Sequence, residues 1–163
     1  MTMRSAATLL ALVAIAAAAP GCGGGDGDSG GDALSKEDYV AQADAICAKA
    51  NKQETALDPG GLGWHYGPKF GDAEFLSEFN DAARAALRRL KALAPPEEDA
   101  GTADDALAAI KRQIDAMDEQ IAALRAGDRA RESEIVNEYE LAYGDLARAA
   151  GLLGLSECQG LST

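Results

Sequence analysis

Residues 107–124 read LAAIKRQIDAMDEQIAAL, and this stretch decides the fold. Its large apolar residues are separated alternately by three and four positions, which places them along one side of an α-helix. A seam of this kind packs against helices that run nearly parallel or antiparallel to it. The helix that contains this segment is expected to begin after Pro96, because a proline followed by three acidic residues suits a first helical turn. Gly127 is expected to end the helix. The residues of the seam are Leu107, Ile110, Ile114, Met117, Ile121 and Leu124.

Two segments before this one also show helical spacing. The first runs from about Ser35, a good N-cap, to about Thr55 and stops before the breaker Asp-Pro-Gly-Gly. The second begins at the cap Asp72, has an apolar stripe that extends to Leu93, and is expected to end before Pro95 and Pro96. Its acidic residues come first and its basic residues last, an order that favours the helix dipole at both ends.

A fourth helix is predicted from about Asp128 to Leu153. Gly151 and Gly154 are expected to loosen its end, and a short tail follows. The connections between the last three helices are short, so these neighbours should be antiparallel. The apolar residues at helical spacing are Ile135, Val136, Tyr139, Ala142, Tyr143, Leu146, Ala149, Ala150 and Leu153.

The four segments predict an all-α fold, an antiparallel up-down four-helix bundle. Composition agrees, because 36 of 163 residues are alanine, which favours helix, and only 5% are aromatic. Few β-branched and aromatic residues argue against a core built from sheets. No internal repeat is present, and the sequence leaves the oligomeric state open.

The first 22 residues read MTMRSAATLLALVAIAAAAPGC. Arg4 precedes an uncharged run whose apolar centre has the length of a secretory h-region, shorter than the ~20 residues of a membrane span. Small residues then lead to Cys22. The segment resembles a bacterial lipoprotein signal, in which the lipobox cysteine is diacylated and becomes the mature N-terminus. The alternative is a secreted protein cleaved near Ala19.

The resemblance implies a domain organisation and a location. Residues 1–21 would be a signal peptide, 22–34 a lipidated cysteine with its tether, and 35–163 the four-helix domain. Acyl chains such as palmitate on Cys22 would attach the protein to the cell membrane on its extracytoplasmic face. The whole chain also resembles the small all-helical envelope lipoproteins of high-GC bacteria, and that resemblance implies no activity.

The tether GGGDGDSGGDAL has too little apolar surface to fold alone and is predicted to be a flexible linker. From Asp26 to Glu37 it partly resembles an EF-hand calcium loop, with acids at positions 1, 3 and 12 and glycine at position 6. It departs from that pattern at position 5, where Gly30 replaces an oxygen ligand, and no helix precedes it. A solvated linker without metal is therefore the favoured interpretation.

Composition excludes several classes of function. The formal net charge of −12 argues against nucleic-acid binding, which needs clustered Lys and Arg. A single histidine excludes most histidine-built metal sites and catalytic triads. The serines at 77, 133 and 156 lack an activating context. We therefore expect no enzyme and no cofactor, but a structural or protein-interaction role at the cell envelope.

Residues 57–71, LDPGGLGWHYGPKFG, are long for a bundle connection and rich in aromatic residues. The favoured interpretation is that the tryptophan and phenylalanine plug one end of the bundle, because tryptophan is more often buried than displayed. The alternative is a shallow pocket for an apolar or carbohydrate-like ligand. The residues that could form it are Trp64, His65, Tyr66, Lys69 and Phe70.

The last prediction is a disulfide between Cys47 and Cys158. If Cys22 is acylated, these two thiols remain, and an exported protein reaches an oxidising compartment. Cys47 lies about 18 Å along its helix from Ser35. The tail from Leu153 can stretch at most about 17 Å, so the pair can meet if the tail folds back along the first helix. The alternative is two buried free cysteines.

Overall fold

The computed structural model describes residues 33–58 and 72–160. Its regular elements in these two ranges are four α-helices and two 3-10 turns, with no strand, so the prediction of an all-α fold is confirmed. Among the described helices, none combines the length and the apolar character of a membrane span. The elements in chain order are α1 (Lys36–Leu57), α2 (Ala73–Leu90), η2 (Glu97–Asp99), α3 (Ala100–Ala126), α4 (Arg129–Leu153) and η3 (Cys158–Gly160).

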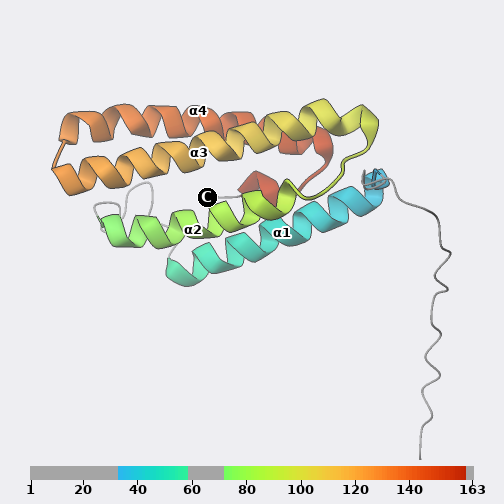
Figure 1. Cartoon of the computed structure of the whole chain (residues 1–163), viewed down its shortest axis with the longest axis horizontal. Helices are drawn as coiled ribbons and strands as arrows, with labels where there is room; N and C mark the ends of the chain where they lie inside the picture. Colours follow the sequence, from blue (N-terminus) through green and yellow to red (C-terminus); the bar gives the residue numbers. More distant parts are fainter. Residues whose placement is uncertain (1–32, 59–71, 161–163) are drawn as a thin grey trace, which may run out of the picture. The chain divides into compact units, whose positions relative to one another are not determined.

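Successive helices run in opposite directions (Figure 1). Two apolar clusters lie between them, and their membership shows the same alternation. The larger cluster combines the second half of α2 with the first half of α3 and the end of α4. The smaller one combines the start of α2 with the second half of α3 and the first half of α4. Such pairing requires α3 to run antiparallel to both α2 and α4.

The C-terminal tail lies between α1 and α4. The backbone of α1 comes close to α2 and to η3, and α4 packs against α3 and η3, whereas α1 and α4 approach each other little. Figure 1 shows the tail, in dark red, returning beside the helices after α4 ends. The tail thus supplies much of the contact that a direct α1–α4 interface would supply in a closed four-helix bundle.

The predicted cap residues begin the helices. The side chains of Ser35, Asp72 and Asp128 each accept a hydrogen bond from a backbone N–H in the first turn, at 3.1, 2.9 and 3.1 Å. These bonds satisfy N–H groups that have no partner within the helix. At the other ends, Gly127 and Gly154 have φ of 69° and 81°, the left-handed conformation that stops α3 and α4.

Helix α2 ends before Pro95, as expected, but its last helical residue is Leu90, so Leu93 of the predicted apolar stripe lies beyond the helix. The N–H groups of Ala92 and Leu93 instead bond carbonyls three residues earlier, in tight turns. The physical reason is that a proline disfavours the helical conformation in the residue before it, so the chain leaves the helix ahead of Pro95.

The expectation that Gly151 would loosen the end of α4 is also wrong. The helix continues through Gly151 to Leu153, and only Gly154 terminates it. No heavy atom lies within 4 Å of the position that a Cβ at Gly151 would take. Neither the backbone conformation nor packing against residues 33–58 and 72–160 therefore requires this glycine.

Candidate functional site

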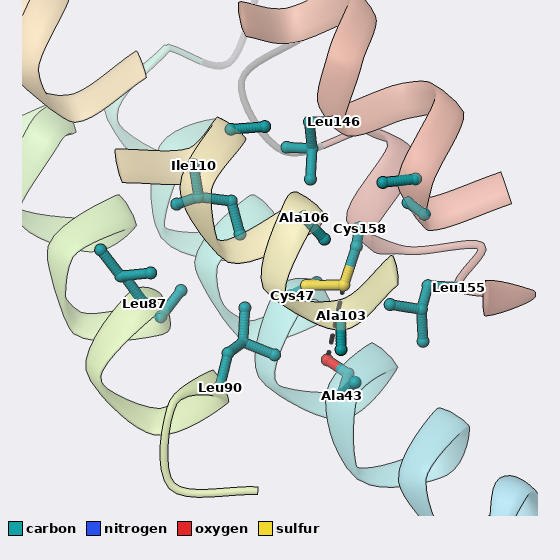
Figure 2. Packing of buried hydrophobic residues seen from close by; sticks show 14 of the residues in the cluster. Ala43, Cys47, Leu87, Leu90, Ala103, Ala106, Ile110, Leu146, Leu155 and Cys158 are labelled. Carbon is teal, nitrogen blue, oxygen red and sulfur yellow. Dashed lines mark hydrogen bonds between the residues drawn. A yellow bond between two sulfur atoms is a disulfide. The ribbon is translucent and has the colours of Figure 1, made fainter. Parts of the chain in front are cut away.

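Cys47 of α1 and Cys158 of η3 form a disulfide, as predicted. Their Cα atoms are 5.0 Å apart, within the usual range for a bridged pair, and the bond joins residues separated by 111 positions. Both side chains are buried, at 0% and 1% exposure. Figure 2 shows the sulfur atoms beside Ala103 and Ala106 of α3, within the larger apolar cluster. The alternative of two free cysteines is wrong.

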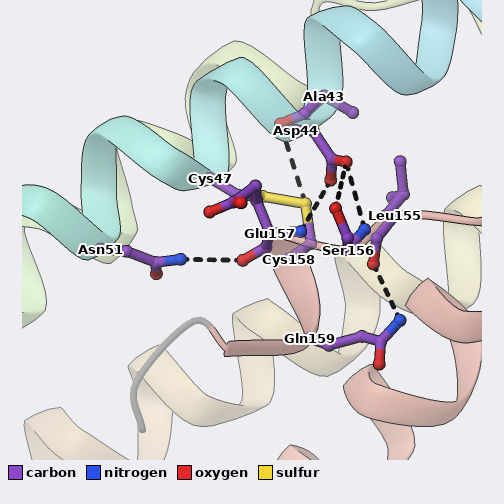
Figure 3. The surroundings of a disulfide bond; sticks show 9 residues. All are labelled: Ala43, Asp44, Cys47, Asn51, Leu155, Ser156, Glu157, Cys158 and Gln159. Carbon is purple, nitrogen blue, oxygen red and sulfur yellow. Dashed lines mark hydrogen bonds between the residues drawn. A yellow bond between two sulfur atoms is a disulfide. The ribbon is translucent and has the colours of Figure 1, made fainter.

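Polar contacts hold the same tail on either side of the disulfide. Asp44 lies one turn before Cys47 on α1 and accepts three hydrogen bonds: from the backbone N–H of Ser156 at 3.2 Å, its hydroxyl at 2.9 Å and the N–H of Glu157 at 3.0 Å. Asn51 lies one turn after Cys47 and donates to the carbonyl of Glu157 at 2.8 Å. Figure 3 shows these three residues of α1 facing the tail.

This arrangement is a structural attachment. Residues three and four positions apart share one face of a helix, so α1 presents a carboxylate, a sulfur and an amide in line toward the tail. The carboxylate of Asp44 satisfies tail N–H groups much as an N-cap does. The Ser156 hydroxyl is also a donor to it, which explains this serine as part of the cap. The Cys158 sulfur, which has no proton to donate, lies 3.8 Å from the Ala43 carbonyl.

A second cluster of polar side chains lies on the opposite pair of helices. Asp145 of α4 pairs with Arg112 of α3 at 2.8 Å and with Arg148 one turn later on α4. Hydrogen bonds from the two guanidinium groups lower the pKa of the Asp145 carboxyl below its usual value. A hollow of about 250 Å³ lies beside it. The lining residues are Thr102, Asp105, Ala108, Arg112, Asp145, Arg148, Ala149 and Leu152.

Two large apolar side chains of α4 face the solvent. Leu141 and Leu152 are 71% and 72% exposed, and Leu152 also lines the hollow. Sequence reasoning did not identify them as functional candidates. The available signal was their absence from the apolar stripe of the fourth helix, because a leucine outside that stripe must point away from the core.

Arginine side chains already balance several acids on α3 and α4. Arg131 contacts Glu119 of α3 as well as Glu134 and Glu138 of its own helix, and these carboxylates raise the pKa of its guanidinium. A basic partner that bound the acidic residues of α3 and α4 would have to compete with such internal ion pairs.

The remaining predicted site residues fall on parts of the chain that the structure leaves undescribed. Cys22 lies outside the described residues, and so do Asp26 and the whole signal segment. The loop residues Trp64, His65, Tyr66, Lys69 and Phe70 lie outside them as well, so plug and ligand pocket both stay predictions. Glu37 is described and lies exposed in the first turn of α1. Within residues 33–58 and 72–160, no group of three or more His, Cys, Asp or Glu side chains is arranged to hold a metal ion.

Comparison of the chain with protein-family models, with curated proteins and with solved structures gave no significant match.

Proposed function

We propose that this protein is an exported bacterial lipoprotein, held on the extracytoplasmic face of the cell membrane by acyl chains on Cys22. Its helical domain has a non-catalytic, structural or protein-interaction role at the envelope. The observation that carries the proposal is the disulfide between Cys47 and Cys158. It accounts for two of the three cysteines and leaves the third at the end of the apolar leader.

The disulfide bears on the compartment of the protein. Such bonds form and persist in secreted and periplasmic proteins and are rare in the cytosol, where thiols are kept reduced. A buried bridge that joins the C-terminal tail to the first helix is of the structural kind. Its presence supports export, and export is what the apolar leader of residues 1–21 also predicts.

The cysteine count then bears on the attachment. One acyl chain gives only marginal membrane binding, whereas two or three give stable anchoring, because each buried CH₂ contributes about 0.8 kcal/mol. The lipobox resemblance places such chains on Cys22, whose thiol the internal disulfide leaves unused.

The test is a Cys22→Ser variant compared with the full chain in the producing bacterium. We expect the variant to lose acyl labelling and to move from the membrane fraction to the soluble or secreted fraction. The matched control is Cys47→Ala, which removes a different cysteine and should keep both the label and the membrane location. Unchanged membrane partitioning of Cys22→Ser would overturn the lipoprotein assignment.

The compartment is tested separately by counting thiols. In Cys22→Ser protein purified without reductant, no thiol should react with an alkylating reagent, and two should react after reduction and unfolding. Two reactive thiols before reduction would contradict the exported location, whatever the result of the fractionation.

A further inference from the structure

Four residues form a line along the solvent-exposed side of α4: Leu141, Asp145, Arg148 and Leu152. Their separations are four, three and four positions, the spacing that places side chains along the contact seam of paired helices. The two leucines are 71% and 72% exposed, and the Arg148 side chain is 71% exposed. We call this line of four residues the outer seam of α4. It lies on a different side of the helix from the apolar stripe that packs into the helix's own bundle.

This outer seam is complementary to itself when it is read in the reverse direction. A two-fold axis passing midway between Asp145 and Arg148 sets Leu141 of one copy opposite Leu152 of the other. The same axis sets each Asp145 opposite an Arg148. We propose that a second copy of this chain docks on the outer seam, with the two α4 helices antiparallel and apolar contacts at both ends of a central charged pair. An isologous contact of this kind is the commonest form of homodimer interface.

Two glycines beside the seam support a close approach of another helix. Gly144 and Gly151 are seven residues apart in α4, both are exposed, and a Cβ at either would meet no heavy atom within 4 Å. Each costs the helix about 0.5–1 kcal/mol relative to alanine, and no packing contact among the described residues requires it. Small residues beside a contact seam let the backbones of two helices come close together. Such a contact would explain why positions 144 and 151 are glycine.

The hollow between α3 and α4 provides the space for an apolar side chain of the second copy. Leu152 lies at its rim, and Ala108 and Ala149 also line it. Because the two-fold axis places the partner's Leu141 opposite Leu152, that leucine would enter the hollow. Each copy then supplies one inserting side chain and one receiving site.

The charge around the hollow is balanced. Asp105 and Asp145 oppose Arg112 and Arg148, so two acids meet two bases, although the chain as a whole has a net charge of −12. Like charge opposes association over most of such a surface. At the outer seam, each Asp145 keeps its ion pairs with Arg112 and Arg148 of its own copy, and the Arg148 of the other copy extends these pairs into a network across the contact.

The first experiment measures the association of the full chain by sedimentation equilibrium in density-matched detergent, so the result does not depend on the membrane anchor. We expect a reversible dimer. Leu141→Asp and Leu152→Asp should each raise the dissociation constant at least tenfold, because each removes a buried leucine contact and buries a charge. The control is Ala122→Asp on an exposed part of α3, which adds the same charge away from the seam. Since Leu141 and Leu152 are exposed, thermal melting should show that both variants remain folded. A monomeric chain, or a dimer that both variants leave intact, would overturn the proposal.

The second experiment tests the orientation. Leu141→Cys and Leu152→Cys chains, one of them tagged, are mixed and oxidised mildly. Only the mixed sample should give a covalent dimer above the level of the unaltered chain. In an antiparallel pair, two copies of position 141 lie 11 residues apart along the seam, about 16 Å, which is beyond disulfide reach. Efficient cross-linking of Leu141→Cys alone would show parallel pairing and refute the two-fold arrangement.

Discussion

Removal of the disulfide by Cys47→Ala together with Cys158→Ala should destabilise the domain strongly. The bond closes a loop across 111 positions, and the loss of that constraint from the unfolded chain is worth about 5 kcal/mol at 25 °C in the chain-entropy description. Domains of this size have unfolding free energies of about 5–15 kcal/mol, so the bridge supplies a large share of the total. The alanine-rich core explains the need, since many of its members bury only a methyl group.

Urea unfolding, followed by far-UV circular dichroism with and without reductant, measures this contribution. We expect a lower midpoint in the double variant and a larger slope of free energy against urea, because the unfolded chain without the cross-link exposes more surface. Reductant should shift the native protein in the same way and should not affect the variant. A loss smaller than about 1 kcal/mol, or an equal response of the variant to reductant, would refute the loop-closure argument.

Two further changes test the local structure by the same unfolding measurement. Asp44→Ala removes the acceptor of three hydrogen bonds from Ser156 and Glu157 and should cost about 1–3 kcal/mol, whereas an unchanged midpoint would mean that the disulfide alone holds the tail. Gly127→Ala should cost about 1 kcal/mol because its φ of 69° is strained for alanine, whereas Gly101→Ala in the first turn of α3 should be neutral or slightly stabilising. Equal effects of the two glycine changes would contradict the assigned end of α3.

The helices that the sequence predicts best are those whose boundaries depend on local chemistry. Asp72 and Asp128 cap α2 and α4 through their own first turns, and Gly127 ends α3 by a conformation that glycine adopts readily. These preferences act over four or five residues, so they can be read without knowledge of the fold. The seam of α3 is equally local, because one helical period repeated over five turns fixes which side faces inward.

The interior contains polar side chains that periodicity could not reveal. Asn80 is buried on α2 and donates both to the carbonyl of Ile114, at 3.1 Å, and to the carboxylate of Asp118, at 3.0 Å. A buried polar group is acceptable only where a neighbouring element offers a partner. Which carbonyl or carboxylate lies opposite is a property of helix pairing, and the pattern within one helix does not contain it.

The disulfide could be predicted, but the contacts around it could not. Cys47 and Cys158 could be paired by counting thiols and by comparing the reach of the tail with the length of the first helix. The role of Asp44 depends on the path of five tail residues, and its spacing from Cys47 has meaning only once that path is known. The same holds for Leu141 and Leu152, because the exposure of a side chain depends on what the neighbouring helices cover.

The proposed lipid anchor on Cys22 and the proposed contact at the outer seam of α4 would have related consequences. Chains anchored to one membrane surface move in two dimensions, and their effective concentration is far above that of the same number of chains in solution. Two copies can then associate at low expression even though each contributes only two leucines, one aspartate and one arginine to the contact. A dimer would also be held by the acyl chains of two copies, so that dissociation from the membrane requires both anchors to leave together. The small size of the seam is therefore consistent with a protein whose association takes place at a membrane surface.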